Sequence, residues 1–197
     1  MKETIKDKLA VVIVWLMLRW DDIKDTIWTV FITCAVCLMI TTWFFKPVVV
    51  QGTSMHPEVH DGAIGFSSII SRNIEEIERF DIVVIDLDVK EENLIKRVIG
   101  LPNETIRYEN SKLYVNGKLI EESFLDSEYV AQQVKKTADG LFTKNFTYIL
   151  GEDEYFCLGD NRLVSMDSRY YGPFSRDNII SKGVFVVYPF ADFGAAR

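Results

Sequence analysis

The sequence predicts an all-β domain that is tethered by one N-terminal transmembrane helix. The run 27–45 is apolar, carries no charge and is long enough to cross the hydrocarbon core of a bilayer as a helix. After Pro47 the pattern changes to short runs of β-branched and aromatic residues that are separated by turn residues. We therefore expect an N-terminal segment 1–26, a transmembrane helix 27–45 and a compact β domain 46–197.

Basic residues predict the direction of the helix. Lys46 is the one basic residue close to its C-terminal end, whereas its N-terminal side carries Lys2, Lys6, Lys8, Arg19 and Lys24. Because basic flanks stay on the cytoplasmic side of a membrane, we expect the N-terminus inside and the β domain outside. Trp28 and Trp43 lie near the two ends, where aromatic rings favour the interface. The chain is thus predicted to be a single-pass protein of the cytoplasmic membrane.

Two alternatives exist for the run 27–45. A cleavable signal peptide has a shorter apolar region that is followed by small residues, whereas this run ends in Trp43, Phe44 and Phe45. A buried core helix seldom reaches this length without a charge. The earlier run 9–18 is too short to span a bilayer, and we expect it to lie on the inner leaflet as an interfacial helix.

The β domain is expected to contain a series of short strands. Asn116-Gly117 lies between two alternating triplets and predicts a type I′ hairpin, because both turn residues adopt positive φ readily. Residues 73–79 are expected to form one helical turn, and residues 121–146 a polar, irregular surface excursion. The expected strands are 48–50, 63–67, 80–87, 93–99, 105–108, 113–115, 118–120, 148–150, 154–158 and 184–188.

Composition excludes several classes of partner. The formal net charge is −7, and the whole excess lies after residue 45, where the predicted β domain begins. An acidic domain argues against nucleic acid, which rewards clustered lysine and arginine. The 2 histidines are too few for a zinc site without other ligands. We expect no nucleic acid partner, no metal and no cofactor.

Ser54 and Lys96 are the candidate catalytic residues. Apolar β-forming residues flank Lys96, and burial of an amine lowers its pKa, so that it can act as a base for a serine nucleophile. Ser54 lies between Gly52 and Pro57 in a turn sequence that exposes its hydroxyl. The alternative is that Lys96 lies on an edge strand with its amine in water.

The stretch 159–169 is rich in hydrogen-bonding side chains, although it follows an apolar run. Alone, it fits a polar loop with local Asx and Ser turns. Together with the Ser54 turn, the Lys-Arg-Val-Ile-Gly-Leu-Pro stretch at 96–102 and the hairpin, it resembles the bacterial type I signal peptidases of peptidase family S26. These are Ser-Lys endopeptidases that remove signal peptides from exported preproteins. The resemblance covers roughly residues 27–190 and implies the compact β fold of this family.

The resemblance implies a role for each matching polar residue. Ser54 is implied to be the nucleophile and Lys96 the general base. Ser165 is expected to hydrogen-bond the lysine amine and orient it. Asp167 and Arg169 match the acidic and basic pair that braces the site.

Other positions match the family less directly. Gly52 stands where some relatives place a serine hydroxyl, which resembles the Gram-positive branch. The oxyanion donors are expected to include the backbone N–H of Ser54. Asp160 and Arg162 are expected to be structural.

Two residues depart from the family pattern. Glu58 replaces the usual threonine after the proline, and Asn103 stands where glycine commonly follows Leu-Pro. Glu58 is expected to point to water, because a carboxylate close to Lys96 would favour the ammonium form. His56 was considered as a base because the endoplasmic-reticulum relatives use histidine in place of the lysine. It occupies a position whose side chain varies in the family, and we expect no catalytic role for it.

The expected function is that of a membrane-anchored hydrolase, a serine protease that processes signal peptides during protein secretion. Its expected partners are the signal peptides of exported preproteins and the phospholipid bilayer. A Ser-Lys self-cleaving repressor would be soluble with a DNA-binding N-terminus, which the apolar run contradicts. A non-catalytic membrane-anchored assembly or binding module on the same fold would be expected to lack Ser54 or Lys96.

Overall fold

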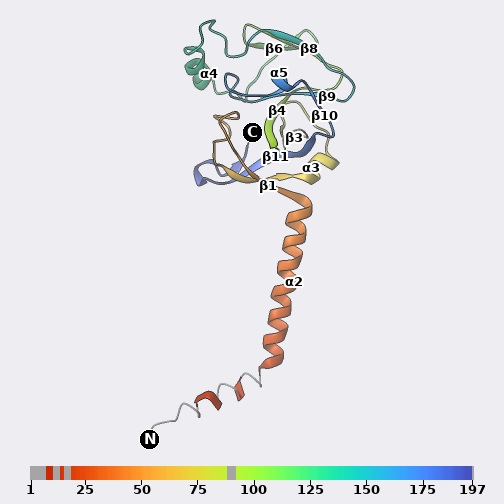
Figure 1. Cartoon of the computed structure of the whole chain (residues 1–197), viewed down its shortest axis with the longest axis vertical. Helices are drawn as coiled ribbons and strands as arrows, with labels where there is room; N and C mark the ends of the chain where they lie inside the picture. The colour runs from red at the N-terminus through yellow and green to blue at the C-terminus, as the bar shows by residue number, and fades with distance from the viewer. Residues whose placement is uncertain (1–7, 11–13, 16–18, 88–91, 197) are drawn as a thin grey trace. The chain divides into compact units, whose positions relative to one another are not determined.

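The structure is a computed structural model that describes residues 8–10, 14–15, 19–87 and 92–196. The chain forms two compact units, Met1–Trp43 and Phe44–Arg197. A long apolar helix, α2 (Trp20–Phe44), makes up most of the first unit, and the second contains all the strands (Figure 1). The protein is therefore mostly β-sheet with one long N-terminal helix, which confirms the predicted fold class.

Helix α2 is long and apolar enough to cross a membrane. It has 25 residues, its most apolar window has a mean hydropathy of 2.0, and none of that window is buried. The helix begins at Trp20 rather than at residue 27, and the acidic Asp21 and Asp22 lie in its first turn, where the helix dipole favours negative charge. The predicted interfacial segment 9–18 lies largely outside the described residues.

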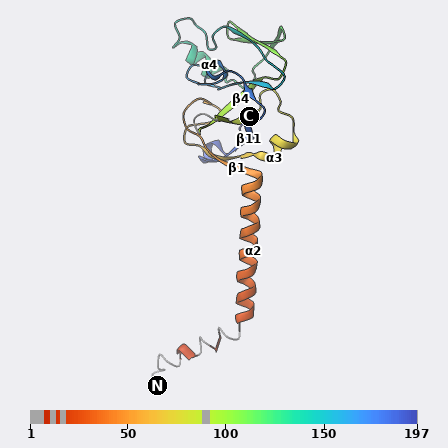
Figure 2. The same ribbon diagram turned by 45° about the vertical axis from the view of Figure 1, so that its right-hand side comes forward.

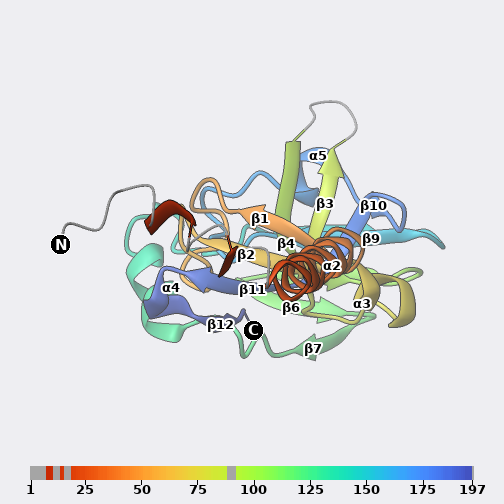
Figure 3. The same cartoon turned by 90° about the horizontal axis from the view of Figure 1, so that it is seen from below.

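The larger of two antiparallel sheets has eight strands. Seven follow the order β1-β2-β11-β3-β4-β9-β10, and β12 pairs with β11. Figure 3 shows β3 and β4 side by side, in agreement with their register from Ile82 opposite Arg97 to Leu87 opposite Glu92. The strands are β1 (Phe45–Val49), β2 (Ile64–Ser68), β3 (Ile82–Leu87), β4 (Glu92–Gly100), β9 (Glu154–Leu158), β10 (Phe174–Ser175), β11 (Ile179–Tyr188) and β12 (Gly194–Ala195).

The smaller sheet has four strands in the order β7-β6-β5-β8. Figures 1 and 2 show that within the β domain its region lies at the end away from β1 and β11. The turn between β6 and β7 has positive φ at Asn116 (49°) and Gly117 (79°), which confirms the predicted hairpin. The strands are β5 (Thr105–Glu109), β6 (Lys112–Val115), β7 (Lys118–Ile120) and β8 (Phe146–Ile149).

Besides small differences at strand ends and the short strands β10 and β12, three regions differ from the sequence prediction. The helical turn expected at 73–79 lies earlier, as α3 (Ile69–Ile74), because the Ser68 side chain caps it by accepting from Ser71 N–H. The excursion 121–146 contains α4 (Ser127–Val134), which Asp126 caps by accepting from Tyr129 N–H. Strand β11 begins at Ile179 rather than at residue 184, because its pairing continues across a register shift beside Gly183.

Two core clusters position the parts of the domain that matter for the site. One holds Met55 and Val59, which follow Ser54 in the chain and are fully buried with Val84 of β3. The other joins the two sheets, with Ile99 of β4 packed in the same cluster as Ile106 of β5. The Ser54 turn is therefore fixed to the larger sheet by its own apolar residues.

A buried ion pair ties the loop after β9 to strand β4. The Arg97 guanidinium donates from Nε to Asp160 Oδ1 (2.9 Å) and from Nη2 to Asp160 Oδ2 (2.7 Å). Both side chains are almost fully buried, and Arg97 Nη1 also donates to the carbonyl of Phe80 (2.9 Å). A paired and fully hydrogen-bonded geometry is what allows two charges to be buried. The loop 159–169 is thereby held beside Lys96.

We expect Arg97→Met to lower the free energy of unfolding by about 3–5 kcal/mol, because Asp160 would remain as a buried carboxylate without its partner. Urea denaturation in detergent, followed by circular dichroism, measures this change. The matched control is Arg107→Met, which breaks the exposed pair with Glu109 and is expected to cost less than about 1 kcal/mol. Equal stability of the two variants would contradict the structural role of the buried pair.

Candidate active site

Lys96 and Ser54 are in hydrogen-bonding contact. Lys96 Nζ donates to Ser54 Oγ at 2.9 Å and to the carbonyl oxygen of Ile95 at 2.8 Å. Lys96 is only 2% exposed, and its strand β4 lies between β3 and β9 inside the larger sheet. The alternative of an edge-strand lysine with its amine in water is therefore excluded.

Burial lowers the pKa of Lys96 to about 8, mainly because the charged ammonium loses its solvation. Asp167 and Asp160 oppose this shift because negative charge near the amine favours the ammonium form, and Arg169 reinforces it. At pH 7 roughly a tenth of the amine is consequently free. A lysine in this state can accept a proton near neutral pH, which an exposed lysine cannot do.

The Ser54 turn lies between β1 and β2 and is held at both ends. Gly52 has a φ of +89°, a conformation that favours glycine, and its N–H donates to Asp61 Oδ1 at 2.7 Å. On the other side, Asn161 N–H donates to Ser54 O (2.9 Å) and Asn161 Nδ2 donates to Thr53 O (3.2 Å). The loop 159–169 is thus hydrogen-bonded to the backbone of Ser54 and of the residue before it.

Gly159 allows the loop to approach the serine closely. A Cβ at this position would overlap Ser165 Oγ and the carbonyl oxygen of Ser54. The Gly159 N–H donates to Asp167 Oδ2 at 3.0 Å. This position therefore requires glycine because of the space available.

Asp167 and Arg169 form a two-point ion pair within this loop. Arg169 donates from Nε to Asp167 Oδ1 and from Nη2 to Asp167 Oδ2, both at 2.8 Å. Burial raises the pKa of Asp167, but the hydrogen bonds and positive charge of Arg169 outweigh it and hold that pKa below its ordinary value. The carboxylate is therefore ionised at neutral pH, and it holds the loop through its hydrogen bonds to Gly159 and Arg169.

The hydrogen bond expected between Ser165 and Lys96 is absent from the structure. The amine donates instead to Ile95 O and Ser54 Oγ, so a main-chain carbonyl takes the place of the second hydroxyl. The buried Ser165 Oγ lies against Gly159, and its hydroxyl contributes to the lowered pKa of Asp167. The side chain is near the expected place, but it points to a different contact.

Arg162 connects the loop to the smaller sheet and to the excursion before it. Its guanidinium is buried and donates to Glu122 Oε1 (2.6 Å), Tyr108 OH (2.9 Å) and Thr143 Oγ1 (3.2 Å). Burial raises the pKa of Tyr108 well above its ordinary value, so the phenol stays neutral in this network. These contacts give Arg162 a structural role. Asp160 has a structural role too, through its ion pair with Arg97.

The residues that depart from the family pattern have ordinary surroundings. Glu58 is partly buried rather than open to water, and it is not among the charges that shift the pKa of Lys96. Asn103 has a φ of +64°, in the left-handed region that asparagine tolerates better than most residues, which explains how it replaces glycine. His56 stacks on Tyr129, with ring centroids 5.2 Å apart. The side-chain partner of Ser54 is Lys96, not His56.

A groove of about 430 Å³ lies along the serine and the lysine. One set of lining residues comes from β1 and the segment after it, and the other from β4 and its neighbour β3. The lining residues are 46–51, Ser54, Met55, Val84 and 93–96. The groove therefore places residues of β1 and β4 beside the Ser54 hydroxyl.

Gly159, Asn161 and Asp61 position the serine, although no role was predicted for them from the sequence. Gly159 and Asn161 could have been suspected, because a glycine directly after an apolar strand and before two polar residues indicates a close backbone approach. No pattern distinguished Asp61 from other turn residues. Among the described residues, no group of three or more His, Cys, Asp or Glu side chains is arranged to hold a metal ion.

Comparison with known proteins gives concordant results. A family model described as signal peptidase, peptidase S26, matches residues 23–188. The chain is 39% identical over 175 residues to signal peptidase I of Bacillus amyloliquefaciens, covering 86% of this chain and 89% of the relative. It is 35% identical over 196 residues to signal peptidase I of Streptococcus pneumoniae serotype 4, with coverage of 85% and 94%. A crystal structure of a signal peptidase I from Enterococcus faecalis V583 matches with 32% identity and a TM-score of 0.49, covering 55% of this chain and 97% of that chain.

The family model spans the Ser54 turn, strand β4 and the loop 159–169, the three segments that meet in the candidate site. The two relatives align over at least 85% of the chain. The chain therefore belongs to the signal peptidase family, peptidase S26, among the bacterial type I signal peptidases.

Proposed function

We propose that this chain is a membrane-anchored serine endopeptidase that removes N-terminal signal peptides from exported preproteins, with Ser54 as nucleophile and Lys96 as general base. The observation that carries the proposal is the 2.9 Å contact between Lys96 Nζ and Ser54 Oγ. The lowered pKa of the buried amine, about 8, makes the base role feasible near neutral pH. The relatives named signal peptidase I support the substrate class.

The reaction begins when the free amine of Lys96 takes the hydroxyl proton of Ser54 and Oγ attacks the scissile carbonyl carbon. The oxyanion that forms needs a donor, and the Ser54 backbone N–H has no acceptor within the described part of the chain. The ammonium then returns its proton to the leaving amine, which gives an acyl-enzyme. In the second half, Lys96 takes a proton from the water that hydrolyses the ester and returns it to Ser54.

The groove fits an extended peptide. Strand β1 pairs with β2 on one side and, among the described strands, has no partner on its other side. An unpaired strand edge binds extended peptides through main-chain hydrogen bonds. Residues of β1 line the groove that leads to Ser54, so a bound segment would deliver its carbonyl to the hydroxyl. The resemblance implies small residues, often alanine, one and three positions before the cut.

The proposed anchor is α2, which crosses the cytoplasmic membrane once. Its length and hydropathy suit a bilayer, and the basic residues before residue 27 favour an inside N-terminus. The catalytic domain would then face outward, where signal peptides emerge. The phospholipid bilayer is accordingly a partner of α2.

A non-catalytic membrane-anchored assembly or binding module on the same fold is the second candidate. It would use the groove to hold a peptide without cutting it. A module of this kind has no need of a lysine buried against a serine, because burial of the amine costs free energy that binding alone does not recover.

We expect Ser54→Ala and Lys96→Arg each to reduce cleavage of a purified preprotein by roughly a thousandfold or more, because one variant lacks the nucleophile and the other keeps a protonated guanidinium. The test uses purified protein in detergent, with cleavage followed by gel electrophoresis. Lys118→Arg, at an exposed position in the β7 strand, is the matched control and should cleave normally. Substantial turnover by Lys96→Arg would contradict the base role, and binding without cleavage by the unaltered chain would favour the module.

We expect kcat/KM to rise about tenfold per pH unit below pH 8 and to level off above it, because only the free amine of Lys96 accepts the proton and its pKa is about 8. A set of initial rates between pH 5.5 and 9.5, with a folded-state check at each end, measures this profile. Burial and the nearby His60 lower the pKa of His56 below 6.5, so a histidine base would place the acidic limb below that pH. A limb there, lost in His56→Asn, would overturn the assignment of Lys96.

We expect a protease added to intact protoplasts to digest residues 47–197 and to spare the N-terminal segment, because the basic flank keeps that segment inside. Epitope tags at the two termini, detected by immunoblotting, distinguish the fragments. Lysed protoplasts are the control in which both tags are lost. A β domain that is protected until lysis would show the reverse orientation.

A further inference from the structure

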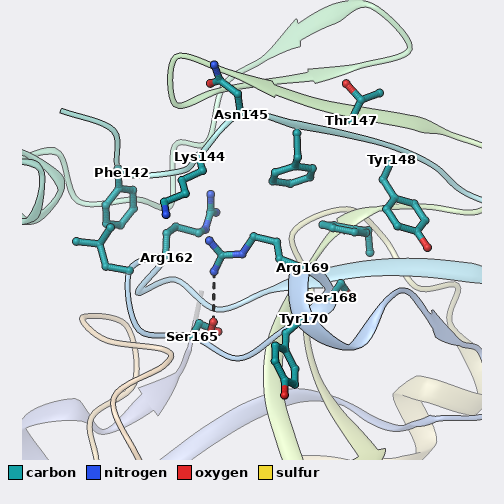
Figure 4. A pocket seen from close by; sticks show the side chains of 13 residues that line it. Phe142, Lys144, Asn145, Thr147, Tyr148, Arg162, Ser165, Ser168, Arg169 and Tyr170 are labelled. Atoms are coloured by element: carbon teal, nitrogen blue, oxygen red, sulfur yellow. Dashed lines mark hydrogen bonds between the residues drawn. The ribbon is translucent and has the colours of Figure 1, made fainter. Parts of the chain in front are cut away.

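A second cavity lies beside the loop 159–169 and shares no lining residue with the groove at Ser54 and Lys96. Its volume is about 490 Å³, within the range that accommodates small molecules. One side is formed by β8 and the segment before it, and the other by the catalytic loop and α5 (Ser168–Tyr171). Figure 4 shows Lys144 and Arg169 reaching into this space from the two sides.

The side chains that line the cavity carry a net positive charge. Lys144, Arg162 and Arg169 line it, and no carboxylate does. Arg162 is neutralised by Glu122 at 2.6 Å, and Arg169 by Asp167 at 2.8 Å. Lys144 is exposed and has no ion pair or hydrogen bond within the described residues. The lining therefore carries one excess positive charge, which suits a ligand with a single negative charge.

The free donors are arranged for a carboxylate. Arg169 uses Nε and Nη2 on Asp167, which leaves Nη1 unused within the described part of the chain. The Lys144 amine lines the same cavity. Two N–H donors from separate side chains match the two oxygens of one carboxylate.

The opposite part of the lining is aromatic. Phe156 contacts Phe146 with ring centroids 5.4 Å apart and Tyr148 with centroids 5.3 Å apart, and all three rings line the cavity. Small-molecule sites generally combine such an apolar wall with a few placed polar groups. A ligand with an aromatic or other apolar body and one carboxylate would satisfy both halves of the lining.

We propose that this cavity binds a small apolar carboxylic acid and that the bound acid inhibits cleavage at neutral pH through Arg169 and the loop that holds Ser54. The binding part stands on the cavity alone, whereas the effect on cleavage rests on the proposed Ser-Lys function. The loop provides the physical connection, because Asn161 N–H holds Ser54 O while Arg169 and Ser165 face the cavity.

The direction of the effect follows from the charges around Lys96. The titratable groups that act on it are Cys157 on β9 and Asp160, Asp167 and Arg169 on the loop and α5. Arg169 lowers the pKa of Lys96 and Asp167 raises it. A carboxylate bound to Arg169 cancels part of its positive field, which raises the Lys96 pKa and leaves less free amine at neutral pH. Inhibition should therefore fade above pH 9, where the amine is free in either case.

The test uses 3-phenylpropionate as the probe with the purified full-length chain in detergent. Its neutral amide and acetate serve as controls, the first without the charge and the second without the apolar body. We expect saturable binding of 3-phenylpropionate by calorimetry and binding at least roughly tenfold weaker for both controls. Lys144→Gln should weaken binding of the probe by a similar factor, which is typical for loss of a charged hydrogen bond. Lys118→Gln, outside the cavity, should leave it unchanged.

The coupling to the active site has a readout that needs no cleavage. The pH at which the ¹³Cε signal of Lys96 titrates should rise by roughly 0.3 unit or more with saturating probe, a twofold change in the amine-to-ammonium ratio. The acidic limb of kcat/KM should move by the same amount. Absence of saturable binding, equal binding of the amide, or an unchanged Lys96 titration in the bound protein would each overturn the proposal. A chain that shows the binding and the shift but cleaves no preprotein would refute the proposed function instead.

Discussion

The burial of a lysine against a serine, without a carboxylate in contact, is the constraint on which the rest of this structure depends. Lys96 is 2% exposed and its amine has two oxygen partners, Ser54 Oγ and Ile95 O, neither of them charged. Such an amine can lose its proton near neutral pH only if its surroundings exclude water and the nearby charges largely balance. A central strand supplies the first condition, since β3 and β9 flank β4 on both sides.

The neighbouring ion pairs meet the second condition. Near the lysine, Arg97 and Asp160 neutralise each other, and so do Arg169 and Asp167. Asp167 and Asp160 raise the pKa of Lys96 and Arg169 lowers it, so that these charges partly offset one another. Desolvation then remains the dominant influence on the Lys96 pKa. The paired charges therefore serve two purposes: they hold the loop in place, and they leave the amine able to lose its proton.

Most of the fold could be predicted from local patterns, and the failures have physical causes. Strand β9 has the bounds expected from its apolar run, and Asn116-Gly117 gave the hairpin, because both depend on neighbours in sequence. The first half of β11 was missed because its pairing crosses a register shift at Gly183. Helix α4 was missed because capping by Asp126, rather than an apolar run, defines it.

In the site, alternation along β4 and the Gly/Pro turn made Lys96 and Ser54 candidates, and the resemblance of the three motifs to the family assigned their roles. The direction of the Ser165 side chain could not be found in this way. It depends on which atoms approach Gly159 when the loop packs on the Ser54 turn, and no spacing in the sequence encodes that contact. The failure affects the orientation of one hydroxyl and leaves the set of residues that meet in the loop unchanged.

Lys96 occupies a buried position of β4 that would suit an apolar side chain. Val98 is fully buried on the same face as Lys96, where an aliphatic residue would pack without a desolvation cost. A lysine at 96 therefore destabilises the sheet relative to valine or leucine, and nothing in the fold requires its charge. Natural sequences depart from such local rules mainly where function demands it. The Ser54 hydroxyl lies 2.9 Å from the amine, and the proposed base role gives a lysine at this position a use that a methyl group could not serve.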